Sequence, residues 1–428
     1  MNEPALLLPS EYAQRIVESG KDRGTLDIKW SEPELLGVVD GFSVGTGDRH
    51  MAGYSNFPKG HFMASANTVP GMGIWFRVEA ELHLARAQAR RQTGALALEY
   101  FRSLVMNRAW INPRRHGITL ALTYVDLGGG EQDWAGWLLT NEQAQWCYAE
   151  LVDENAELLA PLRPSWPLAD LSSLHATVIG VGSIGSAASE ALAGYGLRHL
   201  ALVDPDRLLG HNFARHRAHT SQIGRHKTAA IAEQLRRRDG ELDIEEYPVD
   251  VIWEADVVRP LLDETDIVIV STDGVDSRRA ANHLARRAGK PAVFACVLGD
   301  GAFGELVRSV PPRTGCLLCT RARMIEESGI ANPEPSLDRR YGTGTRHLPM
   351  TAVGTDLGVV GELAAKAAVA TLLEDRGYRE QRLPGDHAVI GLRPKPGFGA
   401  PFDIEHSCEL RWREVPPSRP DCLTCRTA

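Results

Sequence analysis

The feature that most constrains the fold is a glycine-rich turn between an apolar strand and a helix. Residues 176–182, ATVIGVG, predict a buried strand, and 183–196, SIGSAASEALAGYG, predict the helix after it. Gly180, Gly182 and Gly185 form a Gly-x-Gly-x-x-Gly motif across this junction. Gly180 permits the tight turn, Gly182 lets a phosphate approach the backbone, and Gly185 lets the helix pack closely on the strand. Because the helix start presents free N–H groups, the motif predicts a nucleotide site.

The strand–helix alternation continues after this motif and predicts the fold class. Asp204 ends the next strand, about 20 residues on, where a carboxylate can bond ribose hydroxyls. Further elements are expected as a helix at 227–238, a polar-apolar stretch at 244–251, and apolar strands at 266–272 and 292–299. We therefore predict an α/β, Rossmann-like, doubly wound and mostly parallel sheet with right-handed crossovers.

A set of charged residues follows the glycine motif and favours a reaction on ATP. A glycine motif alone is typical of a dinucleotide dehydrogenase, which does not need this many charges. Arg215 and Lys227 can neutralise triphosphate charge, and Asn212 can bond a phosphate or ribose oxygen. Asp273 ends a strand at the edge where open α/β sheets bind ligands, and it can hold Mg²⁺. This chemistry argues against a nicotinamide-dependent oxidoreductase.

The order of these residues resembles the adenylation domain of ubiquitin-activating-type (ThiF/MoeB/HesA) adenylyltransferases, bacterial members included. The match runs from about 176 to 425 through Gly-x-Gly-x-x-Gly, Asp-x-Asp, Asn-x-x-Arg, Gly-x-x-Lys and Thr-Asp-x-x-x-x-Arg. Two positions depart from the family pattern, since Ser183 often is glycine there and His216 often is glutamine. The resemblance implies ATP and Mg²⁺ as cofactors. The nucleotide-binding residues that it implies are Gly180, Gly182, Ser183, Gly185, Asp204, Asp206, Asn212, Arg215, Lys227 and Asp273.

The expected reaction is attack by a substrate carboxylate on the α-phosphorus of ATP, with release of pyrophosphate. No general base is needed because a carboxylate is ionised at neutral pH. Arg215, Lys227 and an Asp273-bound Mg²⁺ would then act by positioning and charge neutralisation. The substrate would be the C-terminus of a ubiquitin-like protein or a short peptide. The alternatives left open are a small carboxylate substrate and an inactive adenylation fold that serves as a scaffold.

Four cysteines predict a structural zinc site. Cys316 and Cys319 form one Cys-x-x-Cys pair, and Cys422 and Cys425 form another. Four thiolates complete the tetrahedral shell of Zn²⁺ and leave no position for water. In the resembling family such a pair of knuckles fastens the C-terminal tail to the domain. The alternative is two reduced dithiols without metal. This cysteine usage fits a reducing, cytoplasmic setting better than a disulfide framework.

No cysteine occurs between Thr320 and Ser407, where family members that form a thioester commonly carry their nucleophile. Residues 347–356 offer only Thr351 and Thr355. Cys408 is then the candidate catalytic cysteine, expected on a strand with His406 on the same face. Three accounts stay open: the reaction stops at the adenylate, Cys408 takes the acyl group, or the chain is an engineered form without its cysteine. A thioester would imply a ubiquitin-conjugating-type enzyme as partner.

The domain organisation is predicted from a proline-rich break near 161–170. It divides an N-terminal α+β domain, 1–165, from the adenylation domain, 166–428, which has a crossover loop at about 320–356 in a Pro/Gly-rich zone. In the first domain we expect a strand and helix over Leu6–Val17, one long helix over Glu79–Val105, and a strand containing Ile118, Leu120, Leu122 and Tyr124. Its pattern resembles the metal-dependent deubiquitinase (JAB/MPN) fold but lacks that family's zinc-binding signature, and we find no catalytic motif in it.

Family resemblance also implies a homodimer in which an arginine from one chain completes the partner's ATP site. Arg77, Arg114 and Arg115 of the N-terminal region are the candidates. The alternative is a monomer in which residues 1–165 themselves cap the site. The net charge of −8 and pI near 6.0 argue against nucleic acid as a partner. The N-terminus lacks the pattern of a signal peptide. The apolar stretch Leu357–Leu373 carries Glu362 and Lys366, which predicts a packed helix rather than a membrane span.

Overall fold

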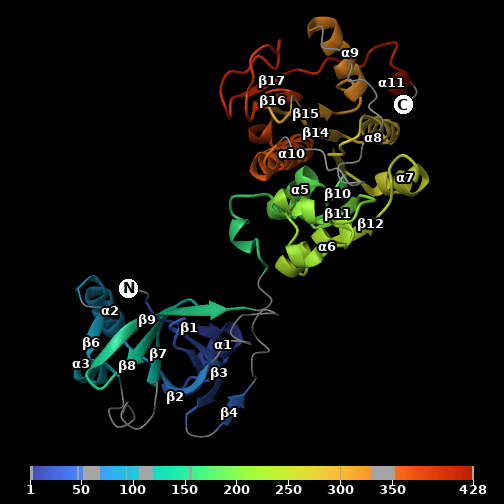
Figure 1. Ribbon diagram of the computed structural model, residues 1–428. Helices are drawn as coiled ribbons and strands as arrows, with labels where there is room; N and C mark the ends of the chain where they lie inside the picture. Colours follow the sequence, from blue (N-terminus) through green and yellow to red (C-terminus); the bar gives the residue numbers. More distant parts are fainter. Residues whose placement is uncertain are drawn as a thin grey trace. The chain divides into compact units, whose positions relative to one another are not determined.

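The structure is a computed structural model that describes residues 3–45, 48–51, 68–92, 94–105, 119–153, 157–298, 300–328 and 352–426 (Figure 1). The chain divides into two compact units, Met1–Glu157 and Leu158–Ala428, where the sequence analysis places the boundary at 165/166. In the described residues, no helix is long and apolar enough to cross a membrane.

The first unit is built on a β-sheet in the order β1-β3-β2-β5-β7-β8-β9-β6, with β4 beside β3. Because β1 also pairs with β9, the strands from β1 round to β9 form a closed ring. The strands are β1 (Ala5–Pro9), β2 (Arg23–Ser31), β3 (Leu36–Val44), β4 (Asp48–Met51), β5 (Val69–Arg77), β6 (Ala95–Ala97), β7 (Thr119–Gly128), β8 (Glu131–Leu139) and β9 (Gln143–Val152).

Helices cover this sheet over two separate apolar clusters. The helix α1 (Ser10–Glu18) packs Tyr12 and Ile16 against a cluster that contains Trp75. The helices α2 (Ala80–Gln92) and α3 (Leu98–Leu104) belong to the second cluster. The predicted strand and helix over Leu6–Val17 are confirmed.

The single long helix predicted over Glu79–Val105 is wrong. The short strand β6 interrupts it and pairs with β9, and Gly94 just before β6 has a φ of +72°. Glycine adopts this left-handed conformation without steric cost, so the apolar and Ala-rich pattern on both sides does not carry the helix across. The predicted strand around Leu120 is β7, whereas Ile118 lies outside the described residues.

The second unit contains the predicted doubly wound, mostly parallel sheet. Its order is β12-β11-β10-β13-β14-β15-β16-β17, parallel as far as β14 and antiparallel beyond it. Its strands are β10 (His175–Ile179), β11 (His199–Val203), β12 (Asp243–Tyr247), β13 (Ile267–Val270), β14 (Ala292–Leu298), β15 (Phe303–Ser309), β16 (His387–Gly391) and β17 (Leu410–Arg413). Of the predicted stretch 244–251, only the first part is strand.

Alternate residues of the parallel strands point to opposite faces of this sheet, and each face is covered by helices. Val178 and Leu202 belong to one cluster with α5 (Ser183–Tyr195), α6 (Lys227–Arg238) and α10 (Gly354–Asp375). Ile179 and Val203 belong to the other, with α7 (Ala255–Glu264) and α8 (Val275–Arg287). Figure 1 shows α5 and α10 beside each other on their face of the sheet. The remaining helices are α4 (Leu168–Ser172), α9 (Leu317–Ser328) and α11 (Leu423–Arg426), with short 3₁₀ turns at Ala160–Leu162, Gly210–Ala214, Thr220–Gln222 and Arg379–Gln381.

Two sequence predictions in this unit need correction. The zone at 311–356 is not loop throughout, because α9 occupies 317–328 and α10 begins at Gly354. The part of the predicted crossover loop at 329–351, with Thr351, lies outside the described residues. Cys408 is not on a strand either: it lies in the turn before β17 with a φ of +64°. The buried helix predicted over Leu357–Leu373 is confirmed within α10.

Candidate functional site

The glycine turn between β10 and α5 is tightly built. Gly180 has a φ of +92°, and a Cβ on Gly185 would come 1.8 Å from the Gly180 carbonyl oxygen. The hydroxyl of Ser271, just after β13, donates a 2.7 Å hydrogen bond to that same oxygen. A Cβ on Gly182 would meet nothing within 4 Å, so the backbone there is open to a ligand. α5 begins at Ser183 without a side-chain cap, which leaves its first N–H groups available to an anion.

Asp204 holds this turn from the end of the neighbouring strand. Its Oδ2 accepts the N–H of Val181 at 2.7 Å, and its Oδ1 accepts the N–H of Asp206 at 2.9 Å. Its side chain is buried. The two aspartates of the predicted pair therefore differ. Both side-chain oxygens of Asp204 accept backbone N–H groups, whereas the Asp206 side chain is half exposed.

Lys227, the first residue of α6, lies between these two carboxylates. Its Nζ is 2.7 Å from Asp206 Oδ2 and 3.8 Å from Asp204 Oδ1, and its backbone N–H donates to the Asp206 carbonyl at 3.0 Å. Burial disfavours the charged amine, but the nearby carboxylates, with a smaller contribution from Asp273, outweigh it and raise the pKa of Lys227. The amine is therefore a fixed positive charge beside the glycine turn.

Asn212 and Arg215 lie in the 3₁₀ turn Gly210–Ala214 and just after it. The side-chain oxygen of Asn212 accepts the N–H of Leu209 at 2.8 Å, and the N–H of Arg215 donates to the Asn212 carbonyl at 3.0 Å. A Cβ on Gly354 would come 2.8 Å from Cα of Arg215, so the start of α10 packs against this turn. Asn212 thus shapes the backbone that carries Arg215.

Asp273 follows β13 at the same edge of the sheet and has an exposed side chain. Arg278, one turn into α8, donates to the Asp273 and Gly274 carbonyls at 3.3 Å and 3.1 Å. The hydroxyl of Thr272 is buried and has no hydrogen-bond partner in the described part of the chain. A buried donor without a partner beside an open backbone turn fits a bound polar ligand such as a nucleotide.

His216 is a contributor to this site that sequence reasoning treated only as a departure from the family pattern. Its Nε2–H donates to the Val181 carbonyl at 2.8 Å, and its Nδ1 accepts the N–H of Ala218 at 3.0 Å. Burial lowers the pKa of His216 to about 4, so the ring is neutral at neutral pH. Val181 is therefore held through its N–H by Asp204 and through its carbonyl by His216. Ser271 and Arg278 are two further contributors that the sequence analysis does not name as site residues. The Thr-Asp-x-x-x-x-Arg motif, which ends at Arg278, is the signal that could have identified Arg278.

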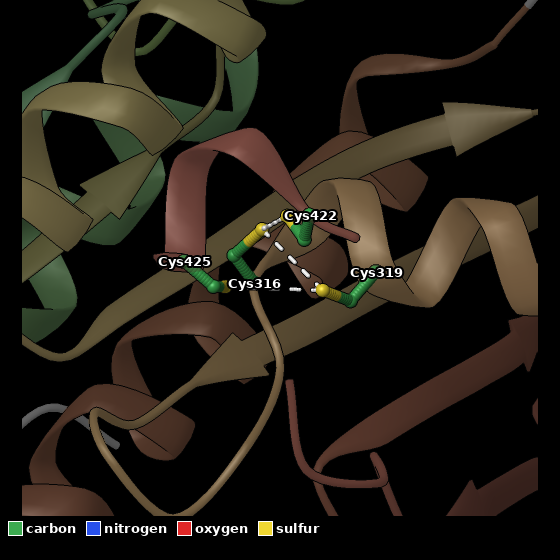
Figure 2. A group of neighbouring side chains, drawn as sticks. All are labelled: Cys316, Cys319, Cys422 and Cys425. Atoms are coloured by element: carbon green, nitrogen blue, oxygen red, sulfur yellow. Dashed lines mark hydrogen bonds between the residues drawn. The ribbon is translucent and has the colours of Figure 1, made fainter. Parts of the chain in front are cut away.

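The four predicted zinc ligands come together where the start of α9 meets α11 (Figure 2). Their ligand atoms all lie within 4.8 Å of one another, with sulfur–sulfur distances of 3.9 Å for Cys316–Cys319, 3.7 Å for Cys316–Cys422 and 3.8 Å for Cys319–Cys425. Zinc–sulfur bonds of ~2.3 Å in a tetrahedron place the sulfurs ~3.8 Å apart. The described cysteines therefore fit a closed Zn²⁺ site.

Backbone contacts support this cluster from outside. The N–H of Arg419 donates to Cys319 Sγ at 3.4 Å, and the N–H of Gly315 donates to the Pro416 carbonyl at 2.8 Å. Arg419 also pairs with Glu326 of α9. The C-terminal segment that leads to α11 is therefore attached to the region of the Cys316–Cys319 pair by these contacts as well as by the cysteines.

Cys408 lies apart from the cysteine cluster, in the connection between β16 and β17. Its thiol is exposed, and its N–H donates to the Gly391 carbonyl at 2.7 Å. His406 and Cys408 share this turn rather than one face of a strand. A catalytic role for Cys408 therefore stays a prediction.

Comparisons with known proteins identify a family. The ThiF family matches residues 156–389. The sulfur carrier protein ThiS adenylyltransferase of Bacillus subtilis (strain 168) is 29% identical over 167 residues, which is 38% of this chain and 48% of that protein. Ubiquitin-like modifier-activating enzyme 5 of Oryza sativa subsp. japonica is 25% identical over 260 residues, which is 57% of this chain and 58% of that protein.

A crystal structure of E. coli MccB with ATP is 19% identical, with a TM-score of 0.43, over 60% of this chain and 68% of that one. The chain spans about half the length of the curated relatives it matches. The family match covers more than half of the 428 residues and includes the glycine turn and the charged residues around it. The chain belongs to the ThiF family.

Proposed function

We propose that this chain uses ATP to adenylate the C-terminal carboxylate of a ubiquitin-like protein or a peptide, and releases pyrophosphate. The observation that carries the proposal is the charge arrangement beside the glycine turn. Lys227 is fixed between Asp204 and Asp206, and the start of α5 is open to an anion. A dinucleotide site has no need of a fixed ammonium at this position, whereas a triphosphate does.

The chain's own residues would act by positioning and by charge neutralisation. The N–H groups at the start of α5 and the Lys227 ammonium bind phosphate oxygens, and Arg215 approaches from the neighbouring turn. Asp206 and Asp273 are the exposed carboxylates that would hold ribose hydroxyls or Mg²⁺. Bound Mg²⁺ would supply charge that offsets the developing pyrophosphate. The substrate carboxylate needs no base, because it attacks in its ionised form.

The test is ATP–pyrophosphate exchange with a matched set of carboxylate substrates. We expect exchange with a ubiquitin-like protein or peptide that ends in a free carboxylate and none with the same substrate carrying a C-terminal amide. Asp273→Ala and Lys227→Ala should each abolish exchange in a folded protein, whereas Arg237→Ala, on the exposed face of the same helix as Lys227, should not. Normal exchange in both site variants would reject the pocket, and exchange with a small carboxylate alone would favour the alternative substrate class.

Three further features belong to this proposal. The cysteine cluster would hold one structural Zn²⁺ per chain. Cys408, if it takes the acyl group, would give a thioester that Cys408→Ser cannot form, and a conjugating-type enzyme would then be the acceptor. The chain would work as a symmetric dimer in which an arginine of one chain completes the ATP site of its partner. Arg77, which pairs with Asp126 at 3.5 Å, is the candidate among the described residues. Arg114 and Arg115 lie outside the described residues. Light scattering that gives a clean 46.8 kDa species with full exchange activity would reject the dimer.

A further inference from the structure

The helix α8 carries a buried arginine that has no anionic partner in the part of the chain that the structure describes. Arg286, in the last turn of α8, is only 5% exposed, and none of the described carboxylates forms an ion pair with it. The carbonyl end of the helix offsets only a small part of this charge, whereas burial of an unpaired ion is costly. A counterion for Arg286 is therefore expected close by.

Arg286 and a second side chain of α8 hold the chain on either side of Cys316. Nη1 of Arg286 donates to the Thr314 carbonyl at 2.9 Å. Asn282 lies one turn earlier on the same face of α8 and is 1% exposed. Its Oδ1 accepts the N–H of Leu317 at 2.9 Å. The buried face of α8 therefore contacts the first knuckle of the cysteine cluster.

Both side chains still have N–H groups to offer. Nδ2 of Asn282 and Nε of Arg286 are buried and have no hydrogen-bond partner among the described residues. The helix α11, which carries Cys425, packs against α8 (Figure 1). Burial raises the pKa of the Cys425 thiol, and the charge of Arg286 acts in the opposite direction. The unpaired guanidinium charge is therefore close to both knuckles of the cluster.

We propose that Arg286 is the buried counterion of a metal–tetrathiolate centre in the cysteine cluster. This inference rests on the structural Zn²⁺ of the proposed function. Four thiolates around one Zn²⁺ leave an excess of negative charge, whereas four protonated thiols carry no charge. The metal-bound cluster therefore supplies the anion that Arg286 lacks, and two reduced dithiols without metal do not.

Arg286 is a positioning residue at this centre rather than a metal ligand. In the described residues no hydrogen bond joins its guanidinium to a sulfur, so it acts through its charge and through the Thr314 carbonyl that it holds. Groups that surround metal ligands tune the affinity for the metal. Arg419 also lies beside the cluster, but it pairs with Glu326 and Asp421, so its charge is already offset.

The experiment measures the Zn²⁺ affinity of the full chain by competition with a chromophoric chelator, and the thermal midpoint with and without Zn²⁺. Arg286→Met keeps an unbranched side chain but removes the charge, and we expect Zn²⁺ to bind about 10–100-fold more weakly. Arg286→Lys keeps the charge, so its affinity should stay within a few-fold of wild type. The rise in thermal midpoint on adding Zn²⁺ should be smaller in Arg286→Met than in wild type. An arginine with a purely structural role would change both midpoints equally.

Two further variants of α8 test whether the charge itself matters. Asn282→Asp keeps the acceptor for the Leu317 N–H but places a carboxylate one turn from Arg286, where it can pair with the guanidinium. Zn²⁺ affinity should fall by about 10–100-fold here as well. Arg287→Met removes an exposed arginine of the same helix turn and should leave the affinity unchanged.

Different results would overturn the two parts of the proposal separately. Equal Zn²⁺ affinity in wild type, Arg286→Met and Asn282→Asp would reject the role of Arg286 and leave the zinc site in place. An equal loss in Arg287→Met would reject it too, because surface charge would then set the affinity. A wild type that binds no Zn²⁺ would reject the zinc site and the inference together. Circular dichroism checks the fold of each variant, and Asn282→Asp carries the test if Arg286→Met does not fold.

Discussion

The glycine turn and the cysteine cluster of the second unit are both candidate ligand sites, but different contacts hold them in shape. At the turn, protein groups already bond the backbone around the open position: Ser271 bonds Gly180, and Asp204 and His216 bond the two polar groups of Val181. At the cluster, the four sulfurs lie within 4.8 Å of one another, and three of the sulfur pairs are 3.7–3.9 Å apart. The first site should keep its shape while a ligand binds and leaves, whereas the second would be completed by the Zn²⁺ that we propose.

The comparison is tested most strongly by separating activity from stability. Lys227→Ala should lower ATP–pyrophosphate exchange by about 10²–10³-fold, because it removes a fixed charge from the transition state. The thermal midpoint should fall less than in the cysteine variant below, because Asp204 loses the ammonium that offsets its burial but keeps both of its backbone partners. Exchange and calorimetry on one preparation measure both quantities.

Arg237→Ala serves as the control for this variant, since Arg237 is also on α6 and pairs with Glu233 at the surface. A large fall in the thermal midpoint of Lys227→Ala would show that the lysine is part of the scaffold. The two kinds of site would then not differ as described.

The cysteine cluster should behave in the opposite way. Cys422→Ser removes one of four ligands, so zinc is lost and the free energy of unfolding should fall by about 3 kcal/mol. For a unit of this size that corresponds to a fall of roughly 6–12 °C in the thermal midpoint. Exchange activity per folded molecule should persist at low temperature, because the glycine turn keeps its own partners. Elemental analysis, calorimetry and exchange check the three statements.

Cys408→Ser is the matched control, because this thiol is exposed and apart from the cluster. It should change neither zinc content nor thermal midpoint. Unchanged zinc in Cys422→Ser would contradict the assignment of the cluster.

The sequence predicted those parts of the second unit where local pattern and fold agree. Gly180, Gly182 and Gly185 are needed for a tight turn, so their spacing marks the strand–helix junction directly. Lys227 was placed correctly at the first residue of its helix. The two Cys-x-x-Cys pairs lie far apart in the chain, so their spacing does not decide the zinc site, and the family resemblance supports grouping them.

The parts that sequence did not predict depend on contacts between distant segments. The long helix expected over Glu79–Val105 is broken by β6, whose pairing with β9 no local pattern reveals. Cys408 sits in an apolar-polar stretch that reads as strand, but its positive φ and its bond to Gly391 make it a turn. Asp204 and Asp206 differ in their hydrogen bonds because the Val181 N–H lies next to Asp204, and only the folded chain shows this contact.

Because His216 is buried beside the turn, the free energy of unfolding should depend on pH within a defined range. Its pKa is 6.5 when unfolded and about 4 when folded, because burial disfavours the charged ring. Between these values the unfolded chain binds a proton that the folded chain does not, so stability falls as pH decreases from about 6.5 to about 4 and this contribution is constant outside that window. The full loss from this group is about 3 kcal/mol. Urea unfolding at a series of pH values, in wild type and His216→Gln, isolates it as the difference; an identical pH dependence in both would contradict the assignment.

The smallest expected effect is that of His216→Gln at pH 7.5, on stability and on exchange alike. A glutamine amide can donate to the Val181 carbonyl and accept the Ala218 N–H, so both bonds of the neutral imidazole have a replacement. We expect a change in unfolding free energy within about 1 kcal/mol and exchange within a few-fold of wild type. His216→Ala is the contrasting variant: it leaves the buried Val181 carbonyl and Ala218 N–H without partners, which costs about 1–3 kcal/mol for each group. Because Val181 adjoins the position where a nucleotide would bind, the KM for ATP should rise in His216→Ala and not in His216→Gln. Equal KM values in the two variants would show that the hydrogen bond of His216 is not needed to hold the turn. The glycine turn would then keep its shape with fewer side-chain hydrogen bonds than the comparison with the cysteine cluster assumes.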